Sequence, residues 1–568
     1  MKPLLVGPSS FEEFRQTNAV FVDKTHFIEE FIQSASEVDI ILRPRRFGKS
    51  LNLSMLNSFF SIGTNPNLFK GLYIFDREFE VDKGPFTSSK KRKVEDQGTF
   101  MEKYCGKYPV IHMNLKDATG KSFEECIDGL WEVVKVSARP HHEAMKGVCP
   151  NDPLYGMYKE SSSTPKLTNV RKCLAMLMKI LYEYHKTQVI VLIDEYDAPL
   201  NNAHRKGFYD EAIDFFVSFF SMALKDNNAL YKACLMGILE IRGTDILSSW
   251  NNVTIYSFLD DKYSSCFGFT LEEVRQLGVD EEELNEVVHW YNGYHFGNSH
   301  VMNPWSVNSW LLKGKQFRNY WIGTANYSEL QNYLKGHEQL MLMEVFNLFF
   351  DGDPFDINLN NTQVNYDDEW DTPKVVTFLV LSGYLTFHQN KVIIPNTEVK
   401  NYWETQILPL FKTAVKNKYG DQVRALFDPR GEFSRQGCLE FMQDVLLNAS
   451  SQDLTRRQYP EAPYHCFYFG IFLGCLHEDD SVLVTSIKEV ALGRYDIRIQ
   501  FVKFKTAFIF EFKVDRSGNN TDQDPGAARQ QIHNTQYYHD LHGYSVHLIG
   551  AAFYKKSVAL SHEFIQLE

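Results

Sequence analysis

The sequence contains no uninterrupted run of 18 or more apolar residues, so nothing in it predicts a transmembrane helix. Its longest apolar segment, FYFGIFLGCL at residues 467–476, is about half the length that spans a bilayer and is typical of a core helix. The first residues, MKPLLVGPSSFEEF, lack the apolar stretch of a signal peptide, so we expect no secretory leader. These absences favour an intracellular protein, nuclear or cytoplasmic, without a membrane partner.

Cysteine pairs and excess positive charge are also missing. The nine cysteines include no C-x-x-C pair, which argues against a typical zinc motif and for reduced thiols inside the cell. A net charge of −13 excludes a uniformly basic coat for nucleic acid. A local basic groove remains compatible with this charge, because charge acts by patch as well as by total.

The chain is long, and its 568 residues are enough for roughly three to four domains. Residues 1–270 alternate helical patterns with short apolar segments, which predicts a parallel sheet covered on both faces. Residues 271–460 are mostly helical in pattern, and residues 461–568 combine a helix, two β-type segments, a second helix and a final strand. The apolar segments of the first region are residues 38–43, 108–115, 187–195 and 230–239.

Residues 43–50 read RPRRFGKS and stand between the apolar VDIIL and the helical SLNLSMLNSFF. A P-loop requires a strand, a tight turn and a helix, with Lys contacting phosphate and Ser or Thr ligating Mg²⁺. Gly48, Lys49 and Ser50 match the end of such a turn. Arg43 occupies the place of its first glycine, so the turn must differ in shape. We predict nucleotide binding at this turn, with Arg45 and Arg46 as further phosphate contacts; a chance match is the alternative.

A second ATPase signal is the segment VIVLIDEYDAPL at residues 189–200. An apolar strand that ends in Asp-Glu is typical of the Walker B position. Asp194 is predicted to hold Mg²⁺ together with Ser50, and Glu195 to orient the attacking water. For Asp197 two roles are open: it assists these groups, or it caps the turn before Pro199.

A different chemistry is indicated by Asp496 in GRYDIRIQ and by Glu511 and Lys513 in FIFEFKV. Residues two positions apart in a strand lie on the same face, so the Glu and the Lys project together. Two acidic groups on adjacent strands and a nearby Lys are typical of a metal-dependent nuclease, and carboxylate ligands suit Mg²⁺ or Mn²⁺. The alternative is an edge strand with a solvated Glu/Lys pair.

Further polar residues flank this pattern. Glu461 begins the preceding helix, and Glu489 lies just upstream of GRYD with an uncertain role. His465 and His533 also flank the site, and we expect packing or capping histidines there in preference to metal ligands.

Six stretches follow one another along the chain: VFVDKTHFIEEFI, RPRRFGKSLNLSML, IVLIDEYDAPL, SSWNNVTIYSF, FGFTLEEV and WYNGYHFG…NPWSV. Together they resemble the AAA-ATPase-like family that carries a C-terminal PD-(D/E)XK nuclease-like domain. The resemblance implies that RPRRFGKS is the family's own form of the loop. It also implies ATP and Mg²⁺ as cofactors and DNA as the nucleic-acid partner. In the family a Gln-Ile is followed by Tyr, matched here by Gln531 and Tyr537. The family's sensor-like strand is followed by Arg, but this chain has Glu240 there and Arg242 two residues on, which leaves ATP hydrolysis open.

A basic run, KKRKVED, lies at residues 90–96. Four consecutive basic residues in a polar segment are typical of a nuclear import signal; a solvated face and a direct DNA contact are the alternatives. The predicted contacts of the import machinery are Lys90, Lys91, Arg92 and Lys93.

The predicted fold class is α/β. We expect a P-loop NTPase domain with a parallel sheet at 1–270, a helical lid or linker at 271–460, and a restriction-endonuclease-like α/β domain at 461–568. The predicted function is ATP binding, with hydrolysis, coupled to Mg²⁺-dependent cleavage of DNA, in a chain that can form oligomers. Two alternatives stay open: an ATPase part that is only a scaffold or binding switch, and a nucleotide-dependent interaction or effector protein with an inactive nuclease fold.

Overall fold

The computed structural model describes most of the chain, and the predicted import signal at Lys90–Lys93 lies outside the described residues together with Arg242 and Glu461. Those assignments therefore stay predictions. The described residues are 4, 7, 9–78, 98–148, 166–240, 251–321, 355–356, 372–430, 432–447, 462–476, 481–486, 489–490, 493–514 and 524–568.

A five-stranded parallel sheet forms the centre of the N-terminal region, in the order β2-β3-β4-β1-β5. Every residue of β1 and β3 is buried, because apolar side chains on both faces are covered by helices. The parallel sheet expected from the sequence is thus confirmed. Its strands are β1 (Val38–Leu42), β2 (Val110–Asn114), β3 (Val189–Asp194), β4 (Leu230–Gly237) and β5 (Val253–Tyr256).

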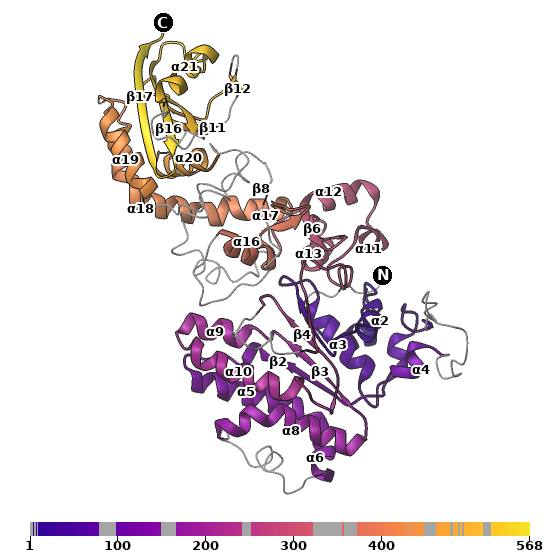
Figure 1. Ribbon diagram of the computed structural model, residues 1–568. Helices are drawn as coiled ribbons and strands as arrows, with labels where there is room; N and C mark the ends of the chain where they lie inside the picture. The colour runs from indigo at the N-terminus through magenta and orange to yellow at the C-terminus, as the bar shows by residue number, and fades with distance from the viewer. Residues whose placement is uncertain are drawn as a thin grey trace, which may run out of the picture.

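Helices surround this sheet (Figure 1). The longer ones present one apolar face inward; α10, for example, buries Phe215, Phe216, Phe219 and Phe220 at helical spacing. The helices are α1 (Phe11–Gln16), α2 (His26–Ile32), α3 (Lys49–Phe60), α4 (Phe100–Tyr104), α5 (Phe123–Ala138), α6 (His142–Val148), α8 (Leu167–His185), α9 (Ala198–Lys206) and α10 (Tyr209–Leu224).

The middle region contains helices and also two small sheets that the helical prediction did not include. One is the hairpin of β6 (Tyr294–Phe296) and β7 (Ser299–Val301); the other has the order β8-β10-β9. Strands of two or three residues are too short to give a period-two pattern, so sequence reasoning missed them. The other elements are α11 (Leu271–Gln276), α12 (Glu281–Tyr291), α13 (Pro304–Leu312), β8 (Phe355–Asp356), α16 (Thr372–Leu381), β9 (Thr386–His388), β10 (Lys391–Ile393), α17 (Thr397–Tyr402), a π-helical turn (Trp403–Ile407), α18 (Leu408–Leu426) and α19 (Arg435–Leu447).

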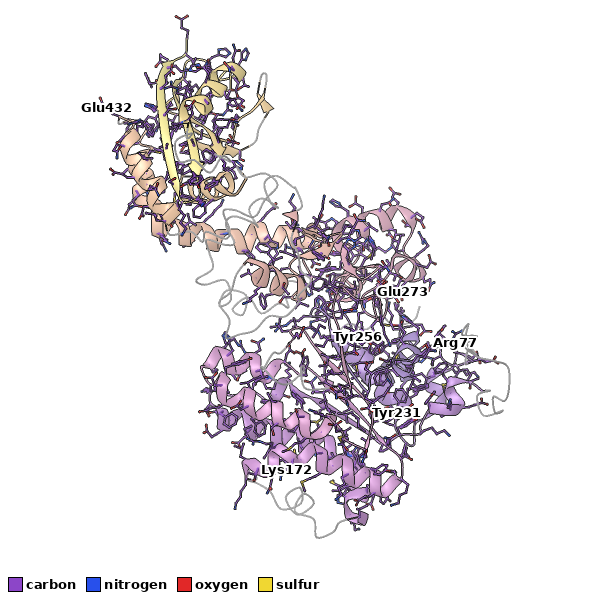
Figure 2. All side chains as sticks on the ribbon, in the orientation of Figure 1. Arg77, Lys172, Tyr231, Tyr256, Glu273 and Glu432 are labelled. Carbon is purple, nitrogen blue, oxygen red and sulfur yellow. The ribbon has the colours of Figure 1, made fainter. Side chains whose placement is uncertain are left out.

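An ion pair joins the middle region to the start of the chain. The ammonium of Lys24 lies 2.7 Å from the carboxylate of Glu273 on α11, and it also donates to the carbonyl of Ser265. Glu273 lies near the boundary between the two regions (Figure 2). The Lys24 side chain is only 8% exposed, so removing its charge from water is costly. The opposite charge of Glu273 offsets this cost.

The C-terminal region holds a second sheet, in the order β11-β14-β15-β16-β17. Only β15 and β16 run parallel in it, joined by a crossover through α21. Both β-type segments, both helices and the strand at 545–554 are confirmed, whereas β11 and β17 were not predicted. The elements are α20 (Ala462–Leu476), β11 (Val482–Ser486), β12 (Glu489–Val490), β13 (Gly493–Arg494), β14 (Ile497–Phe501), β15 (Thr506–Val514), α21 (Pro525–Thr535), β16 (Ser545–Tyr554) and β17 (Ser557–Gln566).

The helix α18 extends from the middle region to the C-terminal sheet, and the two large sheets lie at opposite ends of the molecule (Figure 1). There α18 packs against α20, and α19 packs against β17. Among the described helices, none combines the length and apolar character needed to cross a bilayer.

Candidate functional site

The phosphate-binding turn connects β1 to α3. Gly48 is the N-terminal cap of α3, with φ of 90°, and no side chain caps this helix end. A Cβ atom added at Gly48 would meet nothing within 4 Å, so there is open space beside the start of α3. A helix N-terminus with free N–H groups attracts anions, which fits a phosphate group.

Lys49 and Ser50 begin this helix. The Lys49 ammonium donates to the carbonyls of Arg43 and Pro44, at 3.0 and 2.9 Å, and burial lowers its pKa. The Ser50 hydroxyl donates to Asp194 at 2.5 Å. The structure therefore brings together Ser50 and Asp194, the two residues predicted as Mg²⁺ ligands at this site.

Asn114 also belongs to this group, although sequence reasoning missed it. Its side-chain amide donates to the same carboxylate oxygen of Asp194 at 3.2 Å. The two residues end the parallel strands β2 and β3 and are directly paired in register. Polar residues at the carboxyl ends of neighbouring parallel strands were the signal that could have identified Asn114.

Glu195 and Asp197 follow β3. Glu195 has φ of 51°, a left-handed conformation that turns the chain sharply at the strand end. The buried carboxylate of Asp197 accepts the N–H groups of Ile238 and Leu239, at 3.0 and 2.9 Å. Burial, and then the charge of Glu195, raises the pKa of Asp197 to about 6. Its side chain does not cap α9, so the capping alternative is wrong; it ties the end of β3 to the end of β4.

Arg43 turns its guanidinium away from the phosphate-binding turn. The side chain is fully buried and donates to the carbonyls of Leu42 and Ser257, at 2.8 and 2.7 Å. It also lies over the ring of Phe296, 4.8 Å from its centroid. Arg43 therefore acts as a structural residue at the glycine position, and burial lowers its pKa to about 10.

The other residues of the turn contact the middle region. Arg46 is exposed and lies over the ring of Trp305 at 4.2 Å, while the carbonyl of Arg45 accepts the indole N–H of Trp321 at 3.1 Å. Whether either guanidinium also contacts phosphate, as predicted, stays a prediction. Trp305 and Trp321 of the middle region thus contact Arg46 and Arg45, two of the arginines in the first half of the turn.

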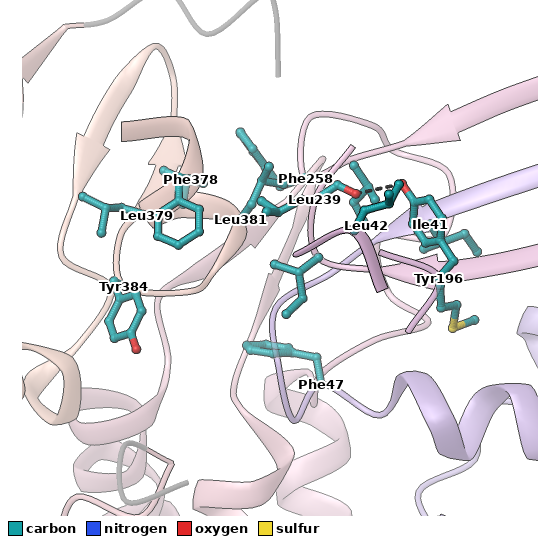
Figure 3. Close-up of a cluster of buried hydrophobic side chains, with 14 of the residues drawn as sticks. Ile41, Leu42, Phe47, Tyr196, Leu239, Phe258, Phe378, Leu379, Leu381 and Tyr384 are labelled. Atoms are coloured by element: carbon teal, nitrogen blue, oxygen red, sulfur yellow. Dashed lines mark hydrogen bonds between the residues drawn. The ribbon is translucent and has the colours of Figure 1, made fainter. Parts of the chain in front are cut away.

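An apolar cluster that includes Phe47 of the loop continues this contact (Figure 3). The ring of Phe47 packs edge-to-face on Tyr294 and Phe296, with centroids 4.9 and 5.3 Å apart. The cluster continues through Leu42 on one side and Leu381 on the other, so it joins the N-terminal sheet to α16. Residues of the middle region therefore pack directly against the P-loop; a lid role for this region stays a prediction.

The second predicted site lies on the C-terminal sheet. Ile497 pairs with Phe510, so Asp496 is level with Glu511 on the neighbouring strand β15. The Asp496 carboxylate accepts the N–H of Phe512 at 2.6 Å. Glu511 is only 4% exposed, and the ammonium of Lys513 lies 3.5 Å from its carboxylate. Asp496, Glu511 and Lys513 are thus brought together.

The helix α21 approaches this site closely because of one glycine. Gly550 pairs directly with Glu511 across β15 and β16. A Cβ at Gly550 would lie 2.1 Å from the carbonyl oxygen of Pro525 and 2.5 Å from the nitrogen of Arg529. Only glycine lets the first turn of α21 rest on the sheet here. Farther along α21, the Gln531 amide donates to the hydroxyl of Tyr537 at 3.2 Å.

The flanking histidines have the packing roles expected of them. His465 Nε2 lies 2.9 Å from the backbone carbonyl of Asp496, which fixes the main chain at that residue. His533 lies 3.2 Å from the carboxylate of Glu563 on β17. Glu489 begins β12, where its backbone pairs with Arg494.

Comparisons with known proteins give a match to a family model at each end of the chain. Residues 5–247 match the family model described as predicted AAA-ATPase, and residues 460–563 match that of the PD-(D/E)XK nuclease superfamily. An uncharacterized protein encoded in the 5′ region of vnfD in Azotobacter chroococcum is 24% identical over 602 residues, covering 98% of this chain and 97% of that protein. A solved Walker-type ATPase of Pyrococcus abyssi aligns with 67% of this chain and 94% of its own, at 13% identity and a TM-score of 0.34. The chain combines an AAA-ATPase-like domain with a C-terminal domain of the PD-(D/E)XK nuclease superfamily.

Proposed function

We propose that this protein binds ATP with Mg²⁺ at the P-loop and cleaves DNA at the C-terminal site in a Mg²⁺-dependent reaction that the nucleotide regulates. The observation that carries the proposal is the grouping of Asp496, Glu511 and Lys513 on adjacent strands. The carboxylate of Glu511 is buried, and a metal ion would add to the compensation of its charge that the ammonium of Lys513 provides, which supports a metal-binding role.

At the nuclease site, Asp496 and Glu511 would hold the metal through their carboxylate oxygens, the ligands that Mg²⁺ prefers. When bound, Mg²⁺ polarises a phosphate and makes a coordinated water more acidic. The ammonium of Lys513, about one-third exposed, can donate a hydrogen bond to the phosphate or to the attacking water. His465 contributes by holding the backbone of Asp496.

At the nucleotide site, the N–H groups at the start of α3 and the ammonium of Lys49 would bind phosphate oxygens. To do so, Lys49 exchanges its two backbone carbonyl partners for the phosphate, which is the stronger, charge-assisted contact. Ser50 and Asp194 would hold Mg²⁺, and Glu195 would orient water for hydrolysis.

Coupling between the two sites is proposed to run through the middle region. Its residues contact the turn at Arg45, Arg46 and Phe47, and its helix α18 continues to the C-terminal sheet. A bound nucleotide that changes the conformation of the turn would favour one arrangement of these contacts over another. Regulation by a ligand requires such a difference in affinity between two conformations.

A nicking assay on supercoiled DNA with Mg²⁺ tests the proposal in the presence of ATP, ADP or no nucleotide. We expect nicking that is lost in Asp496→Ala and Lys513→Ala. It should be retained in the control Lys503→Ala, an exposed lysine in the turn between β14 and β15. ATP should change the rate in the wild type but not in Lys49→Ala.

Other outcomes separate the alternatives. Equal cleavage with all nucleotides would remove the coupling. ATP turnover that persists in Glu195→Gln would reject the assigned role of Glu195, whereas no turnover in the wild type would identify a scaffold or binding switch. The absence of Mg²⁺-dependent nicking would favour a nucleotide-dependent interaction protein with an inactive nuclease fold.

A further inference from the structure

Three histidines converge in the middle region, far along the chain from either site. His295 lies on β6, His300 on β7 and His388 on β9. The ring of His295 is stacked on His388 and meets His300 edge-on, with both centroid distances at 4.1 Å. One ring nitrogen from each histidine lies within 4.8 Å of one from each of the others. The two small sheets therefore present three imidazoles to a common point.

The most buried of these histidines is poised to bind a ligand. His295 is 8% exposed, and its Nδ1 makes no hydrogen bond within the described part of the chain. Burial, with the two neighbouring imidazoles, lowers the pKa of His295 to about 4, so the ring is neutral near pH 7. Neutral imidazole is the form that coordinates metals. A buried ring nitrogen without a partner is costly, and a bound cation would compensate that cost.

The spacing of the nitrogens is compatible with a small ion. Three imidazole nitrogens bound at about 2.0–2.1 Å in a tetrahedral site are about 3.4 Å apart. At present the ring nitrogens lie within 4.8 Å of one another, and small side-chain rotations would bring them to the shorter distance. His300 is exposed and His388 is half-buried, so both side chains can rotate. Three histidines with one open position form a known type of zinc site.

We propose that His295, His300 and His388 bind one divalent transition-metal ion of the Zn²⁺ type, with water as the fourth ligand. Nitrogen ligands distinguish this site from the carboxylate sites proposed for Mg²⁺. Sequence reasoning missed this site. His295 and His300 have an H-x4-H spacing, which occurs among zinc ligands, but the third histidine, His388, lies far along the chain on another strand.

A bound ion would clamp the hairpin β6–β7 to the strand β9. The two elements are already joined by hydrogen bonds from the His295 N–H to the hydroxyl of Thr386 and from the Tyr294 hydroxyl to the carbonyl of Gly383. The residues on either side of His295, Tyr294 and Phe296, pack on Phe47 of the P-loop. The clamp would therefore stiffen the part of the lid that contacts the nucleotide-binding turn.

Cobalt titration of the full-length protein tests this proposal directly. The protein is stripped with a chelator and kept in excess Mg²⁺, so that carboxylate sites are filled. Co²⁺ is then added while its visible absorption is recorded, because four-coordinate Co²⁺ absorbs far more strongly than the hydrated six-coordinate ion. We expect one strongly absorbing Co²⁺ per chain, displaced by Zn²⁺.

Variants assign the ligands. His300→Ala and His388→Ala should each weaken Co²⁺ binding by at least about tenfold, while their metal-free melting temperatures stay at the wild-type value because neither side chain is fully buried. The matched control is His289→Ala, an exposed histidine on α12, which should bind Co²⁺ as the wild type does. A wild-type protein that shows only the weak six-coordinate spectrum would overturn the proposal, as would strong absorption that persists unchanged in His300→Ala.

Discussion

The indole nitrogen of Trp321 donates a hydrogen bond to the backbone carbonyl of Arg45, 3.1 Å away. Arg45 belongs to the nucleotide-binding turn, whereas Trp321 belongs to the middle region, 276 residues further along the chain. The backbone N–H of Trp321 in turn donates to the buried carboxylate of Glu398, at 2.6 Å. The turn is thus connected through Trp321 to a buried carboxyl group of the middle region.

Replacement of Trp321 by Phe should weaken nucleotide binding. The ring remains, but the carbonyl of Arg45 loses its donor, and the turn must then be ordered when the nucleotide binds. One neutral hydrogen bond is worth about 1 kcal/mol, so we expect about a fivefold loss of ATP affinity by calorimetric titration.

Trp310→Phe is the matched control for this loss. Trp310 is just as buried, yet its indole nitrogen has no hydrogen-bond partner in the described part of the chain. The same change there breaks no such bond and should leave ATP affinity unaltered. An equal loss in both variants would attribute the effect to packing and would contradict the role given to the Trp321 hydrogen bond.

Gly48→Ala should weaken ATP binding by forcing a side chain into a left-handed conformation. Space is available for the new methyl group, so the cost is conformational, about 1–2 kcal/mol. Gly207, at the end of α9, also has a positive φ and no atoms near its missing Cβ. Both alanine variants should lose similar stability on thermal unfolding, but only Gly48→Ala should lose ATP affinity. Unchanged affinity in Gly48→Ala would argue against phosphate binding at this turn.

Gly550→Ala should displace α21 from the C-terminal sheet. The new methyl group would overlap the backbone of Pro525 and Arg529, and such overpacking costs about 1–3 kcal/mol. Because Gly550 is paired with Glu511, we expect DNA nicking to fall together with stability. Gly543 has φ of 73°, so Gly543→Ala also costs stability through backbone strain. Its new methyl group, however, meets only the flexible end of Lys505, so nicking should be retained there. Full activity in Gly550→Ala would show that α21 is not needed at the site.

Glu398→Gln should remove a pH dependence of stability. Burial raises the pKa of Glu398 to about 7, against the opposing hydrogen bonds from Ser306, Trp321 and Tyr320. The folded state therefore holds this proton more tightly than the unfolded state, and the contribution of Glu398 to stability falls as pH rises from about 4.5 to about 7.

At about 1.4 kcal/mol per pH unit, the rise in pKa from 4.5 to about 7 corresponds to about 3 kcal/mol. Relative to the wild type, the Gln variant should thus gain stability between about pH 4 and about pH 8. Urea unfolding of both proteins at the two pH values measures the difference. A constant stability difference between variant and wild type would contradict the raised pKa.

Local patterns were enough to predict much of the fold and of both sites. The apolar strands of the first sheet, the turn at Gly48–Ser50 and the helix after it depend on contiguous residues, which sequence periodicity reports directly. The same holds for Glu511 and Lys513, because a strand places residues two apart on one face whatever its neighbours are. The strands β6, β7 and β9 were too short to give such a signal.

The sequence by itself determined which residue types stand at strand ends and turns, and so which chemistry each segment can offer. Only the tertiary structure decided that Arg43 points into the protein interior, that Asn114 joins Asp194, and that three histidines from two small sheets meet. Asn114 and Asp194 are 80 positions apart in the sequence, and His388 belongs to a different small sheet from His295 and His300. Strand order and register set such pairings, and those depend on how all the apolar faces are buried at once, which no local pattern contains.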